Sequence, residues 1–564
     1  MTCGYEPAPR AASSIIRRQH HSKRPTTAEE KALPLHSSRV APIRLLQALE
    51  RMLPEKRERF RKVWNGVIDP ATTGMQPCAH EPDRSLFFSA EDAAVLERDS
   101  IVLRVDEQVR TSRPTRGCVT AFTVVELAKG RRRAIHWPEE QNAASERVYT
   151  PDVPLQHISA YLDDVHTECG AVFDLKCGFW EVLLPESARA WYRFRDASGT
   201  LYEMQRLLMG HRAAVELMQL LTSVVAGDPE VVLAKHAAPA RVRVWVDGFR
   251  YSGVRGDVQS AINLAIENAR ALNATYKDQV SAPVDAYDFI GVHWDHAKHT
   301  VRVADKTLGK LPSSVAAALS ARDIEQLVGR LIFTAGVTQT PLADFYFAMK
   351  WAKRVCHAIN VGLTKIDDSV SVPPSVRQLL DAWIATTSAA HKPRQVRDGE
   401  WPILFTDATL TNYGAVLVMP SRQIFVTGAA FDDGTQQHIA TREAQAVLYA
   451  LQDFHHHLQE VPGVELHIDN TTVEGALRRG AAKSDVLAGV ISDIHHATIL
   501  RSKSRPLEFR VTRIASDDNP ADGPSRETDL DIALLRTALA KRVPLYRRRG
   551  AGSEDPTPLA TTTT

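Results

Sequence analysis

Hydrophobic and polar positions repeat with different periods in three successive parts of this 564-residue chain. Residues 86–300 alternate short strand-type runs with helical segments, and residues 301–395 are mainly helical, as in IEQLVGRLIFTAG. Residues 396–530 return to strands followed by helices. Because a period of about two is typical of strands and one of about 3.6 of helices, the pattern predicts a multidomain α+β protein.

The segment VPLQHISAYLDDVH carries paired aspartates, a feature that can mark a metal site. Its apolar residues recur at helical spacing, at Leu155, Ile158, Tyr161, Leu162 and Val165. Asp163 and Asp164 are therefore expected on the polar face of a surface helix, where acids are common. We predict that this pair has no catalytic role.

Two further acids stand beside apolar runs. Asp174 follows the strand-like run GAVF, and Asp247 follows the alternating run RVRVWV. An acid within a buried strand is costly unless it is paired or binds a metal. Asp247-Gly248 is a hairpin signal, since both central residues of a type I′ turn need positive φ. Two interpretations stay open: a plain hairpin after a strand-end acid, or an acid at a hairpin tip that faces Asp174.

Six segments follow one another along the first part of the chain: KGRRRAIHWPEEQNAA, PLQHISAYLDD, FDLKCGF, RDASGTLYEMQRLLMGHRAAVELMQ, VWVDGF and DFIGVHWD. In this order they resemble the reverse transcriptases of retroelements. FDLKCGF is similar to that family's first catalytic motif, with Asp174 as the acid and Phe179 as the aromatic residue. VWVDGF stands where the family has a two-aspartate hairpin, but Gly248 replaces the second aspartate; elements of the DIRS and VIPER type tolerate an asparagine there.

Four acids in the last part of the chain each lie at the end of a predicted element. They are Asp407 in ILFTDATLTNYGAVLV, Glu443 in ATREAQAVLYALQDF, Asp469 in VELHIDNTTVEGAL and Asp522 in DDNPADGPSR. In this order they resemble ribonuclease H, and the flanks Asn-Thr-Thr and Asp-Gly-Pro-Ser-Arg are most similar to DIRS-type elements. That family often has a histidine before the last acid, near the place where this chain has Arg513.

The resemblance covers about residues 100–530 and implies a right-hand polymerase fold followed by an α/β ribonuclease H-like domain. The expected parts are a basic, partly disordered region at 1–85, fingers and palm at 86–300, a helical thumb and connection at 301–395, a ribonuclease H-like domain at 396–530 and a tail at 531–564.

The same resemblance implies two Mg²⁺ ions in each site, with Mn²⁺ as a substitute. The implied metal ligands and catalytic residues are Asp174 and Asp247 for the polymerase, and Asp407, Glu443, Asp469 and Asp522 for the nuclease. Arg133 would neutralise triphosphate charge, Phe179 would exclude a 2′-hydroxyl, and Gly210 would let the backbone approach the nascent base pair.

The implied partners are an RNA template, a DNA primer, RNA–DNA hybrids, deoxynucleoside triphosphates and other retroelement proteins. The expected function is that of a retrotransposon RNA-directed DNA polymerase that also degrades the RNA of hybrids. Gly248 leaves an alternative open, a decayed or domesticated copy that binds nucleic acid without polymerising, or that retains ribonuclease H alone.

Composition agrees with an intracellular globular protein. The chain is 44% hydrophobic and 24% charged with a net charge of +2, but residues 1–62 carry 14 Lys and Arg against 6 Asp and Glu. Such a basic arm can hold a polyanion, or it can be a solvated tail. Six cysteines form no CxxC pair, and no apolar run approaches the length of a membrane span or a secretory signal. We therefore expect a protein of the nucleus or cytoplasm, neither secreted nor membrane-bound.

Overall fold

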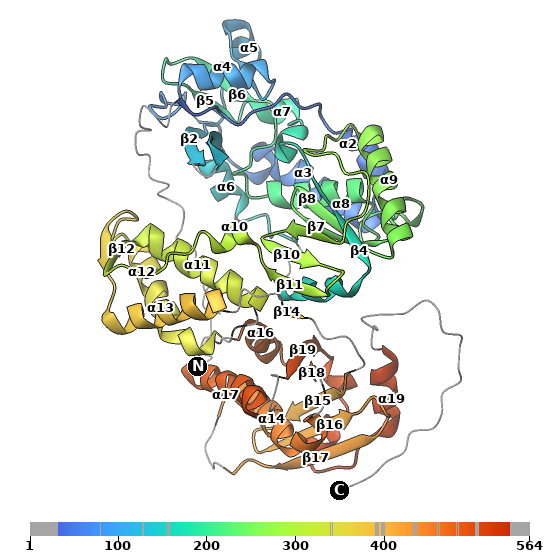
Figure 1. Ribbon diagram of the computed structural model, residues 1–564. Helices are drawn as coiled ribbons and strands as arrows, with labels where there is room; N and C mark the ends of the chain where they lie inside the picture. Colours follow the sequence, from blue (N-terminus) through green and yellow to red (C-terminus); the bar gives the residue numbers. More distant parts are fainter. Residues whose placement is uncertain are drawn as a thin grey trace, which may run out of the picture. The chain divides into compact units, whose positions relative to one another are not determined.

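The computed structural model divides into two compact units (Figure 1). Among the residues that the structure describes, the amino-terminal unit comprises 32–157 and Asp163–Ala304, and the carboxy-terminal unit comprises Ile158–Leu162 and 305–541. The described residues are 32–541 except for short segments at 79–80, 127–128, 154, 156–157, 339, 341, 390–393, 396–400, 433–436, 460, 462, 481, 483 and 502–506. Within these ranges, no helix combines the length and the apolar character needed to cross a membrane.

The amino-terminal unit is built around an antiparallel sheet in the order β4 (Cys169–Asp174), β8 (Gly248–Gly253) and β7 (Arg241–Trp245). The helices α8 (Ala214–Ala226) and α9 (Arg255–Leu272) pack on this sheet (Figure 1). Burial of all but one side chain of α8 explains why its sequence, AVELMQLLTSVVA, is so apolar. Because the strands are antiparallel, the end of β4 and the β7–β8 connection lie at the same edge of the sheet.

Smaller sheets and helices complete this unit. The strands form three further groups: β1 (Val102–Arg104), β6 (Leu201–Met204) and β5 (Arg193–Arg195); β2 (Thr120–Glu126) and β3 (Arg131–Trp137); and β9 (Ala286–Phe289), β10 (Val292–Asp295) and β11 (Thr300–Val303). The helices are α2 (Leu45–Arg51), α3 (Pro54–Val67), α4 (Ala90–Arg98), α5 (Glu107–Ser112), α6 (Glu139–Ser145) and α7 (Glu186–Arg189). Helix α3 starts at Pro54, where a proline's fixed φ suits a first helical position.

The segment with paired aspartates is a 3-10 helix, η3 (Ile158–His166), and the prediction that both acids face solvent is wrong for Asp164. Its side chain is about 2% exposed and accepts hydrogen bonds from the guanidiniums of Arg241, Arg243 and Arg250. Burial alone would raise the pKa of Asp164, but the three cations lower it to about 2. Asp164 is therefore the centre of a buried ion cluster, while the side chain of Asp163 lies outside the described part of the structure.

The carboxy-terminal unit contains a helical part and a sheet part. The helical part has α10 (Asp305–Leu308), α11 (Ala321–Thr338), α12 (Tyr346–Asn360) and α13 (Pro374–Ala389), with a small sheet of β12 (Ala318–Ser320) and β13 (Ser369–Ser371). Its core is an apolar cluster in which the rings of Phe345 and Trp383 stack at 4.7 Å.

The sheet part has five strands in the order β17 (Ile424–Ala430), β16 (Asn412–Val418), β15 (Ile403–Ala408), β18 (Gly463–Ile468) and β19 (Glu508–Arg513). β15, β18 and β19 are parallel to one another, and β16 and β17 join as antiparallel neighbours. The side chains of successive strand residues point to opposite faces of the sheet and form two apolar layers. One layer packs with α14 (Ile439–Asp453), α16 (Thr471–Arg479) and α17 (Asp485–Arg501), and the other with α19 (Ile532–Lys541). Because β15 and β18 are adjacent and parallel, their carboxyl ends lie at the same edge of the sheet.

Candidate active sites

The β7–β8 hairpin presents Asp247 at its tip. Trp245 pairs with Gly248, so Val246 and Asp247 are the two loop residues, and Val246 has the positive φ of 58°. The prediction of a turn centred on Asp247 and Gly248 with two positive φ values is therefore wrong by one residue. Gly248 is instead the first residue of β8, where it pairs with Asp174.

Asp174 and Asp247 are brought together by this register. The backbone N–H of Leu175 donates to the carbonyl of Asp247 at 2.9 Å, which joins the end of β4 to the hairpin tip. Burial raises the pKa of Asp247, and the charge of Asp174 raises it further. Burial also raises the pKa of Asp174, against the effect of the nearby Lys277 ammonium. Two carboxylates that repel each other at a half-buried edge are suited to bind a divalent cation between them.

Two neighbours of these acids were not singled out in the sequence. Lys277 Nζ lies 3.7 Å from Asp174 Oδ2, and no local motif identifies it because the contact depends on pairing between distant segments. A Cβ at Gly178 would lie 2.8 Å from Cβ of Asp247, so only glycine fits against the hairpin tip. The FDLKCGF segment contains this glycine, which was the one available signal.

The predicted nucleotide-binding residues occupy three different settings. Phe179 lies in the 3-10 helix η4 (Gly178–Glu181), and its ring is buried in the main core. Arg133, on β3, forms an ion pair of 3.3 Å with Glu126. Burial and the charge of Asp174 have the larger effects on the pKa of Asp247 and raise it, whereas the charge of Arg133 has a smaller effect and lowers it. The roles of both residues stay predictions.

Gly210 has a packing role that the sequence did not reveal. A Cβ there would lie 3.0 Å from the Trp137 ring and 3.1 Å from the His136 carbonyl, so the close approach is to the end of β3. The side chain of Asn142 fixes the same turn, donating to the Gly210 carbonyl at 2.9 Å and accepting from the Arg212 N–H at 2.8 Å. The approach of Gly210 to a base pair stays a prediction.

Three of the four predicted nuclease acids converge at the edge where β15 and β18 end. Asp407 lies in β15, Asp469 directly follows β18, and Glu443 lies in α14, which packs across β15. Each residue offers a carboxylate oxygen, and the three oxygens lie within 4.8 Å of one another. In the described ranges this is the one cluster of three or more possible metal ligands.

The electrostatics of this three-acid group also fit a cation. Burial raises the pKa of Asp407 to about 6, opposed by the Ser525 hydroxyl and reinforced by Asp469 and Asp522. Burial raises the pKa of Glu443 to about 9, and the other two acids of the group reinforce this effect. Glu443 Oε2 is buried and has no hydrogen-bond partner within the described structure. Oxygen ligands of this kind are those that Mg²⁺ and Mn²⁺ prefer.

Asp522 lies beside the three-acid group rather than in it. It starts the short helix α18 (Asp522–Ser525), forms an ion pair of 2.7 Å with Arg526, and raises the pKa of Asp407 after the larger effect of burial. Ser525 anchors the helix, because its hydroxyl donates to Asp407 Oδ2. Gly414 lets α18 sit on β16, since a Cβ there would overlap the Ser525 backbone nitrogen. Arg513 is the exposed last residue of β19.

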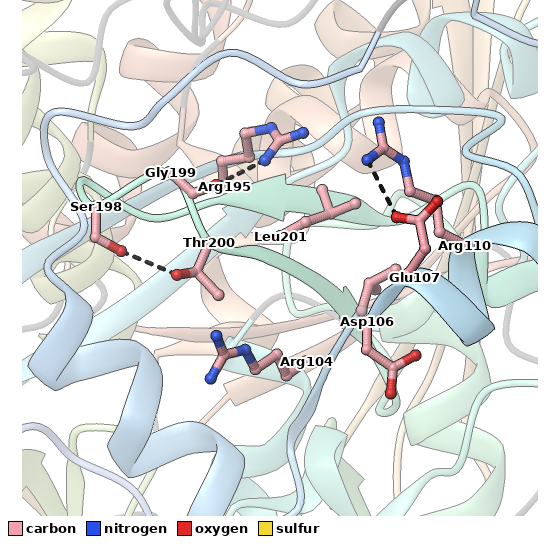
Figure 2. A pocket seen from close by; sticks show the side chains of 10 residues that line it. Arg104, Asp106, Glu107, Arg110, Arg195, Ser198, Gly199, Thr200 and Leu201 are labelled. Atoms are coloured by element: carbon pink, nitrogen blue, oxygen red, sulfur yellow. Dashed lines mark hydrogen bonds and ion pairs between the residues drawn. The ribbon is translucent and has the colours of Figure 1, made fainter.

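A cavity of about 580 Å³ lies elsewhere in the amino-terminal unit, between α5 and the β5–β6 hairpin (Figure 2). None of the predicted site residues lines it. Two of its cations, Arg110 and Arg195, share the carboxylate of Glu81, and Arg110 also pairs with Glu107. Both arginines therefore have acidic partners within the protein.

Comparison with known proteins does not assign a family to this chain. No family model and no curated protein matches the chain. Three solved structures of a foamy viral protease-reverse transcriptase align with the chain. The dRH form with double-stranded DNA has a TM-score of 0.42 and 11% identity, and the alignment covers 84% of this chain and 82% of that one. The complex with an RNA/DNA hybrid has a TM-score of 0.44, 12% identity and coverage of 91% of this chain and 65% of that one, and the complex with double-stranded DNA has a TM-score of 0.42, 10% identity and coverage of 83% of this chain and 96% of that one. At TM-scores this low the functional assignment has to come from the residues of this chain.

Proposed function

We propose that this protein is the RNA-directed DNA polymerase of a DIRS- or VIPER-type retrotransposon and that its carboxy-terminal unit degrades the RNA strand of RNA–DNA hybrids. The observation that supports this best is the three-acid group of Asp407, Glu443 and Asp469, which follows, in the same chain, a second acidic edge with Asp174 and Asp247. Its partners would be an RNA template, a DNA primer and deoxynucleoside triphosphates, encountered inside the cell.

In the polymerase site, Asp174 and Asp247 would hold the cations and Arg133 would bind the triphosphate. Two bound Mg²⁺ ions supply charge stabilisation at the attacking and leaving oxygens of the phosphoryl transfer. The chain's own contribution is rigidity: the Leu175–Asp247 hydrogen bond and the close packing of Gly178 hold the two acids on one edge. Lys277 would neutralise Asp174 before the cations bind.

In the nuclease site, Asp407, Glu443 and Asp469 would hold the cations, and Asp522 would help to orient water at the RNA phosphate. Because the pKa of Glu443 is raised to about 9, this acid would give up a proton when a divalent cation binds near pH 7. Selectivity for a hybrid would come from contacts with 2′-hydroxyls on one strand and from helix shape on the other.

Two assays on the full chain test the proposal. Primer extension on a primed RNA template should occur with Mg²⁺ or Mn²⁺, and Asp174→Ala should abolish it. Cleavage of the RNA in a hybrid should fall by several orders of magnitude in Asp469→Asn, whereas extension should be nearly unchanged. Asp517→Asn is a matched control, because Asp517 is an exposed acid of the same unit. Cleavage that persists in Asp469→Asn would contradict the nuclease assignment.

A second candidate function, ribonuclease H without polymerisation, is favoured by one observation. Gly248 has no side chain, so the polymerase edge carries two acids where the nuclease edge carries a three-acid group. Hybrid cleavage without any primer extension, in Mg²⁺ and in Mn²⁺, would support this decayed or domesticated form. Binding of primed template without either reaction would point to a nucleic-acid-binding copy.

A further inference from the structure

Glu181 is a fully buried acid at the end of η4, seven residues after Asp174. Its Oε1 accepts a hydrogen bond of 2.9 Å from the backbone N–H of Thr275, and its Oε2 is buried and has no partner in the described structure. Burial raises the pKa of Glu181 to about 8, so the carboxyl is largely neutral near pH 7. A buried carboxyl with an unsatisfied oxygen is costly, and its chain neighbours Phe179, Trp180 and Val182 belong to the apolar core.

Thr275 begins a short edge segment that pairs with the end of β4. Lys176 N–H donates to the Thr275 carbonyl at 2.8 Å, and Lys277 N–H donates to the Asp174 carbonyl at 2.8 Å. Leu175 and Tyr276 form the antiparallel bridge between these two bonds. The segment 275–277 therefore places the Lys277 ammonium 3.7 Å from the Asp174 carboxylate, and the first N–H of the segment is bound by Glu181.

We propose that Glu181 is a positioning residue of the polymerase site: by binding the Thr275 N–H, it fixes the segment 275–277 on β4 and so fixes Asp174 and its partner Lys277. This inference rests on the proposed polymerase function. Glu181 touches no substrate and acts through the backbone. The isosteric amide of glutamine keeps the accepting oxygen, whereas leucine has a similar size and no acceptor.

Primer extension by the full chain tests this through matched variants. Glu181→Leu should lower kcat on the order of tenfold to a hundredfold, the effect of a displacement of about 1 Å at a reacting centre. KM for the nucleotide should change little, because the residues that bind it are untouched. Glu181→Gln should stay within about threefold of the unsubstituted chain, which corresponds to less than about 1 kcal/mol. Hybrid cleavage, which belongs to the other unit, should be unchanged in both variants and reports that the carboxy-terminal unit is intact.

Hydrogen exchange gives a readout that needs no activity. Backbone amides of residues 275–277 should exchange faster in Glu181→Leu than in Glu181→Gln, whereas strand β15 should be unaffected. Glu186→Leu is the control, since that acid of the same unit is 76% exposed.

Equal exchange in the two Glu181 variants would overturn the inference. So would a Glu181→Gln variant as slow in extension as Glu181→Leu, because the acid itself and not its accepting oxygen would then be required. If the unsubstituted chain does not extend primers at all, the proposed polymerase function fails, and the exchange data alone decide whether Glu181 holds the segment. Should Glu181→Leu not fold, the result for Glu181→Gln still decides.

Discussion

Replacement of Asp164 by asparagine is expected to destabilise the amino-terminal unit strongly, although the acid lies in a segment that looks like a solvent-facing helix. The variant keeps the size of the side chain and removes the negative charge that Asp164 presents to Arg241, Arg243 and Arg250. Arg250 is fully buried and its guanidinium also lies 3.7 Å above the Trp294 ring. The loss would therefore remove the ion pair that Asp164 forms with the buried Arg250 guanidinium.

Two estimates give the size of this effect. Removal of one partner from a buried ion pair costs about 3–5 kcal/mol. Independently, the pKa of Asp164 falls from 3.8 to about 2, and at about 1.4 kcal/mol per pKa unit this amounts to roughly 2–3 kcal/mol. Arg241 and Arg243 are 36% and 30% exposed, so solvent screens part of their attraction, and about 3 kcal/mol is a reasonable expectation.

The sign of the pH dependence follows from the lowered pKa. The ionised form of Asp164 is favoured in the folded state, so its contribution is complete above the pKa of the unfolded chain, near 3.8. The contribution is lost as the pH falls from there toward 2. Asp164→Asn should therefore differ most from the unsubstituted chain at neutral pH, and the difference should shrink below pH of about 4.

Urea-dependent hydrogen exchange, read separately from β7–β8 and β15, measures this in the full chain. Glu168→Gln is the matched control, because Glu168 pairs with Arg255 at sites about half exposed and such exposed pairs contribute little to stability. Equal loss of stability in Asp164→Asn and Glu168→Gln would refute the reasoning. A loss that spreads to β15 would show that the two units unfold together.

Three other substitutions test the active-site geometry. Gly248→Asp should raise primer extension at low Mg²⁺, because Gly248 needs no positive φ and its Cβ would lie 3.6 Å from Asp174 Oδ1, leaving room for a further carboxylate; an unchanged Mg²⁺ requirement would contradict this. Glu443→Gln should raise the melting temperature of the carboxy-terminal unit at pH 8 in a chelator while abolishing hybrid cleavage. The pKa of Glu443 is about 9 in the folded chain and 4.5 in the unfolded chain, so ionisation of this acid opposes folding more and more as the pH rises above 4.5. The gain in the Glu443→Gln variant should therefore vanish near pH 4.5. Gly178→Ala should lower extension and leave hybrid cleavage unchanged, because the added methyl group would displace the Asp247 hairpin tip.

The sequence by itself determined the order of elements and the acids that lie at their ends. Alternation in RVRVWV predicted a strand, and the Asp-Gly signal predicted the β7–β8 hairpin, because period and turn chemistry are local properties. Asp407, Glu443 and Asp469 could be chosen in advance because the resemblance identified them one by one. Their convergence within 4.8 Å follows from the adjacent parallel strands β15 and β18, which carry Asp407 and Asp469 at their ends, and from the packing of α14, which carries Glu443, on β15.

Only the tertiary structure decided the environment of each side chain. Asp164 has the sequence context of a surface acid, but three arginines from β7 and β8 surround it, and their positions depend on strand pairing about 80 residues away. The turn register at Val246, the contact of Lys277 with Asp174 and the burial of Glu181 have the same origin. Hydrophobic period reports which face of an element is apolar, whereas the partner of a polar group depends on contacts between distant segments, which no local pattern records.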